Sequence, residues 1–422
     1  MLRAFLLAAA LTVAGTAGPA IAQDIVPRDV ERGVTVQTRP RPDFDPLGLR
    51  IGGFRLDAAL EAGLGFDSNV FGRTSNIVSD GFGSQLGRAS FASTWSRHAL
   101  GASGSFGARQ YFTESSLDFT DWDLGGFGRY DLSADTNVEA RYRHYRQHLD
   151  VFSFDVQTAG IFRPVPYSSD EGQVSATTRL NRVGLLATAV YRTFRFEDVP
   201  ALGNNGNVSV NDFDTLIGAL GASYALAPGR SVTGVVRLQD IRYTNSTTGS
   251  DPLRGRDSFT WEALLGFQYD FDGVWQGRIG LGWRQREYTG SELKALSGPA
   301  VEGELSWAPT LLTTVRFAVA SSIEESIRQD AVSYRRYIGS VTVDHELRRN
   351  VILTGQVRGE RRAYEQPSQS ASDLILTAGS TWLINRNLAL VGAYSFQDRL
   401  EATGGFREFG RHLVVVRLRV AL

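Results

Sequence analysis

The chain has 422 residues, with 44 Lys and Arg against 45 Asp and Glu, 45 Gly and no Cys. The absence of Cys excludes a disulfide-stabilised scaffold and any site built on a thiolate. A net charge of −1 lacks the basic excess of a nucleic-acid-binding protein, so we expect no nucleic-acid partner.

Residues 1–22 have the layout of a cleavable secretory signal peptide. Arg3 supplies the positive start, an apolar run from Ala4 to Val13 follows, and Ala22 ends a small-residue cleavage pattern. We therefore expect a mature chain that begins near Gln23 and leaves the cytoplasm. Residues 23–50 are rich in Pro and Arg. Because Pro lacks a ladder donor and fixes φ, we predict an extended periplasmic segment there rather than a small domain.

From residue 51 to residue 422, apolar and polar side chains alternate. In the stretch 54–66 every second residue is apolar, and the residues between them include Arg55, Asp57 and Glu61. A typical soluble strand has about 5–6 residues, whereas a tilted strand that crosses a bilayer needs roughly 9–11. Short polar turns alternate with longer polar connectors, as in outer-membrane barrels with periplasmic turns and extracellular loops.

The sequence therefore predicts an all-β fold: one transmembrane antiparallel up-and-down β-barrel of about 18 strands (roughly 16–18) over residues 51–422. The strand cores are expected at 53–66, 82–95, 99–112, 120–132, 136–149, 171–181, 183–196, 212–226, 230–243, 257–270, 274–287, 299–308, 310–321, 334–346, 350–363, 372–384, 387–398 and 410–422. Only a closed sheet pairs every backbone group of membrane-spanning strands. A soluble propeller is the alternative, but its blades need four short strands per repeat rather than two long ones.

If the apolar side of each strand faces lipid, the other side lines the lumen. That side carries the candidate selectivity residues Arg55, Arg109, Arg141, Arg143, Arg179, Arg192, Arg278, Arg284, Arg286, Arg316, Arg358, Arg362, Arg417, Glu262, Asp270, Glu302 and Glu304, together with Arg419, Asp57, Glu61, Asp344, Glu360 and Asp373. Arg outnumbers the acids in this set. One hypothesis is an Arg-lined conduit for anionic solutes or an acidic polysaccharide. The other is a wet wall in which Arg and acids pair across strands and stiffen the barrel.

The sequence contains no recognisable catalytic or cofactor motif, so we predict no catalytic residue, no metal site and no cofactor. His144 and His148 are four residues apart, which on a strand is about 13 Å and too far for direct chelation of one metal ion. The run Asp67-Ser68-Asn69-Val70 follows the first strand. Its simplest interpretation is a strand-exit turn, because Asp, Ser and Asn bond their own backbone.

Residues 35–71 resemble the entry of the β-barrel porin 2 family. The matching positions are Arg39, Arg41, Pro42, Pro46, Gly48, Arg50, Gly53, Phe54, Asp67, Asn69 and Val70. The resemblance implies an outer-membrane β-barrel, and some relatives accompany exopolysaccharide systems, which implies a role in export. The expected partners are outer-membrane lipid and lipopolysaccharide, the barrel assembly machinery and periplasmic export proteins. The last strand ends in aliphatic residues up to Leu422, whereas such barrels often end in an aromatic residue that the machinery reads.

These observations predict a porin-like pore of the cell outer membrane that passes anionic solutes or an exported polysaccharide. The alternatives are a structural or adhesive barrel with a blocked lumen and, least favoured, a barrel enzyme. The segment 23–50 could supply a plug by folding back into the lumen.

Overall fold

The computed structural model describes residues 34–422, apart from 201–205, 246–254, 271–272 and 329. The expected signal peptide therefore lies outside the described residues, as does the first part of the segment 23–50. The strands are β1 (Leu49–Ile51), β2 (Phe54–Asp67), β3 (Asp80–Ser93), β4 (Ala99–Tyr111), β5 (Phe119–Asp131), β6 (Thr136–Leu149), β7 (Val165–Leu180), β8 (Val183–Phe196), β9 (Phe213–Ala227), β10 (Arg230–Tyr243), β11 (Ser258–Asp270), β12 (Trp275–Tyr288), β13 (Leu296–Thr310), β14 (Thr313–Glu325), β15 (Ser333–Arg348), β16 (Val351–Tyr364), β17 (Gln369–Leu383), β18 (Leu388–Ala402) and β19 (Gly410–Ala421). The described residues also form three short helices, η3 (Ser115–Leu117), α2 (Phe154–Thr158) and η4 (Ser209–Asn211).

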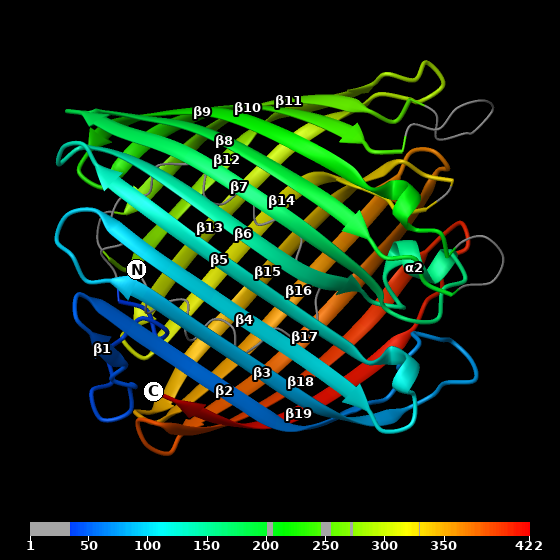
Figure 1. Ribbon diagram of the computed structural model, residues 1–422, viewed down its shortest axis with the longest axis horizontal. Coiled ribbons are helices and arrows are strands. Elements are labelled where there is room, and N and C mark those ends of the chain that lie inside the picture. Colours follow the sequence, from blue (N-terminus) through cyan, green and yellow to red (C-terminus); the bar gives the residue numbers. More distant parts are fainter. Residues whose placement is uncertain (1–33, 201–205, 246–254, 271–272, 329) are drawn as a thin grey trace.

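The strands form one closed antiparallel barrel (Figure 1). Each strand from β2 to β18 pairs with the next, and β19 pairs with β2, from Leu413 opposite Asp67 to Ala421 opposite Ala59. β1 pairs only with the start of β2, so 18 long strands make the cylinder, which confirms the predicted fold class. Strand β1 itself was not predicted.

Most strand ends differ from the expected cores by a few residues, and the larger differences lie toward the loops. β7 begins at Val165 instead of 171, and β18 continues to Ala402 instead of 398. The added residues of β7 pair with β6, and those of β18 pair with β17. Periodicity alone misses them because loop-side strand ends carry polar residues on both faces.

The two faces of the barrel differ in exposure as a closed sheet requires. On β2, Leu60 and Leu64 point outward and are 53% and 64% exposed, whereas Asp57 and Glu61 point inward and are each 3% exposed. The outward face is thus an apolar surface suited to lipid, and the inward face holds the charged groups. The outer belt includes aromatic residues at strand ends, such as Trp275 and Trp307, whose rings stack at 5.1 Å.

Short turns gather at one end of the barrel and longer connectors at the other (Figure 1). Two-residue connections such as 228–229 lie at the turn end, and Gly229 has the positive φ of 71° that this tight turn needs. The connector 150–164, which carries α2, lies at the loop end. By the usual orientation of such barrels, the turn end faces the periplasm.

Candidate functional site

The strand registers place every candidate selectivity residue named above on the inward face. For example, Arg284 lies opposite Glu262, and Arg278 lies opposite Glu304. Paired residues point to the same face, so the registers carry the inward direction of Glu61 from strand to strand around the barrel. The inward row also holds arginines that the sequence interpretation did not name, including Arg88, Arg237, Arg336, Arg399 and Arg411. The same alternation could have found Arg88, Arg237 and Arg336. Arg399 was missed because it was assigned to a connector, and Arg411 stands at the edge of that connector.

Glu360 on β16 is the centre of one inward ion-pair network. It accepts hydrogen bonds from Arg336 Nε at 2.9 Å, Arg358 Nη2 at 2.7 Å and Arg362 Nε at 2.7 Å. Arg336 also donates to Glu324 on β14 at 2.9 Å. Because burying a charge is costly unless it is paired, a shift in register among β14, β15 and β16 would leave a buried charge of this network without its partner.

Glu61 on β2 is the centre of a second network, across the seam where the barrel closes. Arg417 Nε and Arg419 Nε of β19 donate to its two oxygens at 2.9 and 2.7 Å. Arg88 of β3 lies 4.0 Å from the same carboxylate. Three guanidinium groups therefore share one buried carboxylate.

A third network spans β10 to β13. Arg237 and Arg284 both pair with Glu262, and Arg237 also reaches Glu302 at 2.9 Å. Nearby, Arg286 is 1% exposed and pairs with Glu325. Cross-strand pairing of Arg with acids thus describes much of the inward face.

The connector 150–164, called the inward loop below, crosses the loop end of the lumen. It joins β6 to β7 yet contacts β16 and β18, which lie roughly on the opposite side of the closed sheet. Arg399 Nη2 of β18 donates to the carbonyl of Phe152 at 3.0 Å, and Tyr364 of β16 donates to Asp155 at 2.5 Å. Because β6 and β16 are not neighbours in the ring, the loop reaches these residues only by crossing the lumen.

Apolar packing holds the inward loop in place. Phe154 is 2% exposed and packs with Tyr334, Tyr364 and Phe406. Its ring also lies 4.1 Å from the guanidinium carbon of Arg399. A packed apolar cluster therefore anchors the inward loop against the barrel wall at this end of the lumen.

A second apolar cluster joins the inward loop to other connectors. Val156 packs with Val208 and Ile327 from the connectors after β8 and β14. Asn211 Nδ2 donates to the carbonyl of Ile327 at 2.9 Å. Connectors from three parts of the ring therefore meet over the lumen.

Asp155 on the inward loop is a buried acid. Burial raises its pKa above the ordinary value, and this effect outweighs the hydrogen bonds from Tyr364 and Ser326 and the charges of Arg362 and Arg328. Ser326 Oγ donates to Asp155 Oδ1 at 2.8 Å, and the Tyr364 hydroxyl donates to this same oxygen. The docked loop thus favours the neutral form of this side chain.

Residues 34–48, called the N-terminal segment below, lie against the inward face at the turn end. The backbone N–H of Val36 donates to Thr314 Oγ1 at 2.9 Å, and Arg41 Nη2 donates to Glu346 at 2.7 Å. The segment is turned rather than extended, because Arg39 N–H bonds the Thr35 carbonyl. The expectation of an extended conformation was therefore wrong for these residues. Their backbone forms turns, and hydrogen bonds to β14 and β15 hold the turned segment against the wall.

Asp67, the last residue of β2, lies at the loop-side end of the pairing between β2 and β19. It is fully buried and pairs with Arg411 of β19. Its Oδ1 also accepts the backbone N–H of Asn69 at 3.1 Å, as expected of a strand-exit turn. The side chain of Asn69 in turn donates to the carbonyl of Gly410 at 3.0 Å. The run that begins at Asp67 therefore forms a turn and also links β2 to the start of β19, where the barrel closes.

The described residues contain no group of His, Asp and Glu arranged to hold a metal ion. His144 Nδ1 lies 2.7 Å from Asp170, while His148 lies between Asp121 and Asp150, so the two histidines have separate carboxylate partners. Within the described part of the chain, no helix has the length and apolar character needed to span a membrane.

A closed antiparallel barrel with an apolar outer belt and a charged inner wall is the architecture of a porin-like outer-membrane protein. Residues 41–422 match the family described as Putative beta-barrel porin 2, and the chain belongs to this family. Fold and family indicate an outer-membrane location and point to a channel rather than an enzyme.

Solved structures resemble this barrel at low sequence identity. OccK2 (OpdF) of Pseudomonas aeruginosa in complex with glucuronate shares 13% identity over 87% of this chain and 98% of its own, with a TM-score of 0.48. The siderophore receptor PirA of Acinetobacter baumannii shares 8% identity over 86% of this chain and 80% of its own, with a TM-score of 0.47. No curated protein matches the sequence.

Proposed function

We propose that the protein is a gated outer-membrane channel for small anionic solutes. The observation that carries the proposal is the gathering of three guanidinium groups, those of Arg88, Arg417 and Arg419, around the single carboxylate of Glu61 on the inward face. Guanidinium groups present a fixed donor fork to carboxylate and phosphate. A charged lining of this kind sets the sign of the ions that a pore prefers.

The inward loop supplies the gate in this proposal. Its apolar packing around Phe154 describes a closed channel, and undocking of the loop would open the loop end of the lumen. Gating by a loop is consistent with the contacts, because side chains of β16 and β18 hold the loop and the loop adds no strand to the barrel. The exported polysaccharide implied by the family resemblance would need the whole loop to leave the lumen.

A structural or adhesive barrel with a blocked lumen is the second candidate. It is favoured by the burial of Phe152, Phe154 and Val156, which are 6%, 2% and 0% exposed. A permanently docked loop would leave the inward arginines with a purely structural role.

Reversal potentials in planar lipid bilayers under a KCl gradient test the proposal. We expect the full chain to prefer chloride, and Arg358→Gln to weaken that preference. This variant leaves no orphaned acid, because Arg336 and Arg362 still pair with Glu360. The matched control is Arg361→Gln on the same strand, whose 51% exposed outward side chain should leave selectivity unchanged. Cation preference would contradict the proposal, and absence of conductance would favour the blocked barrel.

A further inference from the structure

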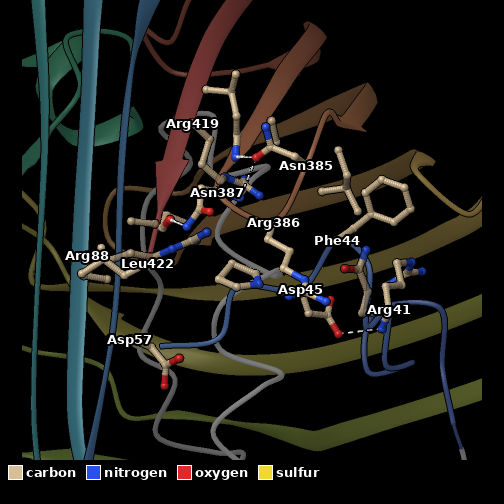
Figure 2. A pocket seen from close by; sticks show the side chains of 18 of the residues that line it. Arg41, Phe44, Asp45, Asp57, Arg88, Asn385, Arg386, Asn387, Arg419 and Leu422 are labelled. Carbon is tan, nitrogen blue, oxygen red and sulfur yellow. Dashed lines mark hydrogen bonds between the residues drawn. The ribbon is translucent and has the colours of Figure 1, made fainter. Parts of the chain in front are cut away.

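The turn end of the lumen contains a cavity between the N-terminal segment and the barrel wall (Figure 2). Its volume is about 90 Å³. One water molecule needs roughly 10–15 Å³ by this measure, so a compact organic molecule has room. Phe44 and Asp45 line it from the N-terminal segment, Arg88 and Arg419 from the barrel wall, and Arg386 from the turn between β17 and β18.

Basic groups outnumber acidic groups around this cavity. The charged lining residues are Arg39, Arg41, Arg55, Arg88, Arg386 and Arg419 against Asp45 and Asp57. Both carboxylates are already engaged, since Asp57 pairs with Arg55 at 2.6 Å and Asp45 accepts the backbone N–H of Arg41 at 2.6 Å. With Glu61 and Glu346 included, which pair with Arg88, Arg419 and Arg41 from beside the cavity, basic side chains still outnumber acidic ones there.

Three of these arginines also have buried donor atoms without a hydrogen-bond partner. They are Arg41 Nε, Arg88 Nε and Arg419 Nη2. Arg41 and Arg419 are only 5% and 6% exposed. Leaving a charged donor both buried and unpaired is costly, and rotation of these guanidinium groups toward an anionic oxygen in the cavity would remove that cost.

The rest of the lining is mostly apolar. Phe44, Ala59, Leu383 and Ala421 contribute carbon surface beside the guanidinium groups. A ligand that is charged all over, such as inorganic phosphate, would leave this surface without a partner. A carboxylate attached to a small apolar body satisfies both parts of the lining.

We propose that this cavity binds a small carboxylate with a compact apolar body. Its oxygens accept hydrogen bonds from Arg88 and Arg419, and its body packs against Phe44 and Leu383. The inference rests on the proposed function in one respect, because such a solute reaches the cavity through the lumen. The cavity would then be a binding station at the periplasmic mouth of the channel.

Ligand titration of the detergent-solubilised full chain, followed by saturation-transfer NMR, tests the proposal. Benzoate is the probe, with inorganic phosphate as the fully charged comparison and benzylamine as the cationic one. We expect saturable binding of benzoate, weaker binding of phosphate and no binding of benzylamine. Arg419→Gln should weaken benzoate binding at least tenfold, and Glu61 keeps Arg417 and Arg88 beside it in that variant.

Two further variants guard against a folding artefact. Arg386→Gln removes a lining charge from an exposed turn and should weaken binding several-fold without touching a strand. Arg349→Gln removes a charge from an exposed turn that does not line the cavity, and it should bind benzoate as the parent does.

The possible outcomes distinguish a failure of the proposed binding site from a failure of the proposed channel. Failure to bind benzoate, or equal binding by the parent and Arg419→Gln, would overturn the site. Tighter binding of phosphate than of benzoate would overturn the apolar part of the proposal. Chloride preference in bilayers without benzoate binding would refute the site and leave the channel standing. Binding without conductance would refute the channel and leave the site standing.

Discussion

Phe154 is the residue whose removal should most directly open the channel. Its side chain is 2% exposed, packs edge-to-face on Phe406 with ring centroids 5.5 Å apart, and lies 4.5 Å from the guanidinium carbon of Arg362. Truncating a buried Phe to Ala costs about 3–5 kcal/mol. Each 1.4 kcal/mol is a factor of about ten, so Phe154→Ala should shift the inward loop toward its undocked state at least about 100-fold. The barrel should survive, because the loop contributes no strand pairing.

Single-channel recording in planar bilayers measures this shift as open probability. Heat-modifiable migration on SDS gels checks that the barrel is folded. The matched control is Phe162→Ala in the same loop, whose side chain is 42% exposed and should leave open probability unchanged. Equal open probability in the parent and in a folded Phe154→Ala variant would refute the gating role of the loop.

Three further predictions concern the same structure. Because burial raises the pKa of Asp155, docking of the inward loop should be strongest below the ordinary Asp pKa and should weaken as pH rises through the raised pKa. Open probability should therefore rise with pH. The Asp155→Asn variant should flatten that rise. Arg336→Met should lower barrel stability by about 3–5 kcal/mol in guanidinium unfolding, because Glu324 loses a buried partner; Arg335→Met, at an outward position, should cost less than about 1 kcal/mol. Deleting residues 23–45 should raise single-channel conductance, since the N-terminal segment lies in the turn-end mouth; an unchanged current would show that the segment does not restrict flow.

The barrel could be predicted from the sequence because alternation is a local signal. A strand such as β2 repeats apolar and polar residues along its whole length, and the pattern predicts both the strand and the side that faces the lumen. The inward direction of Arg284 and Glu262 follows from parity alone.

The two mouths could not be predicted in this way. The inward loop is held by contacts between Asp155 and Tyr364, which are 209 residues apart in the chain. Periodicity carries no information about such contacts. The sharing of Glu61 among three arginines could not be predicted for the same reason. Arg419 contacts Glu61 only because the first and last long strands pair.

The closed cylinder turns its apolar face to lipid and its polar face to water, and neighbouring residues on one strand can test this directly. The chain has no Cys, so single cysteines can carry spin labels without background. Ser340 and Val341 are neighbours on β15 that point inward and outward, respectively. In liposomes, electron paramagnetic resonance of Val341→Cys should show contact with lipid-soluble oxygen, and Ser340→Cys should show contact with a water-soluble nickel reagent. Identical accessibility at the two positions, or the reverse pattern, would contradict the account.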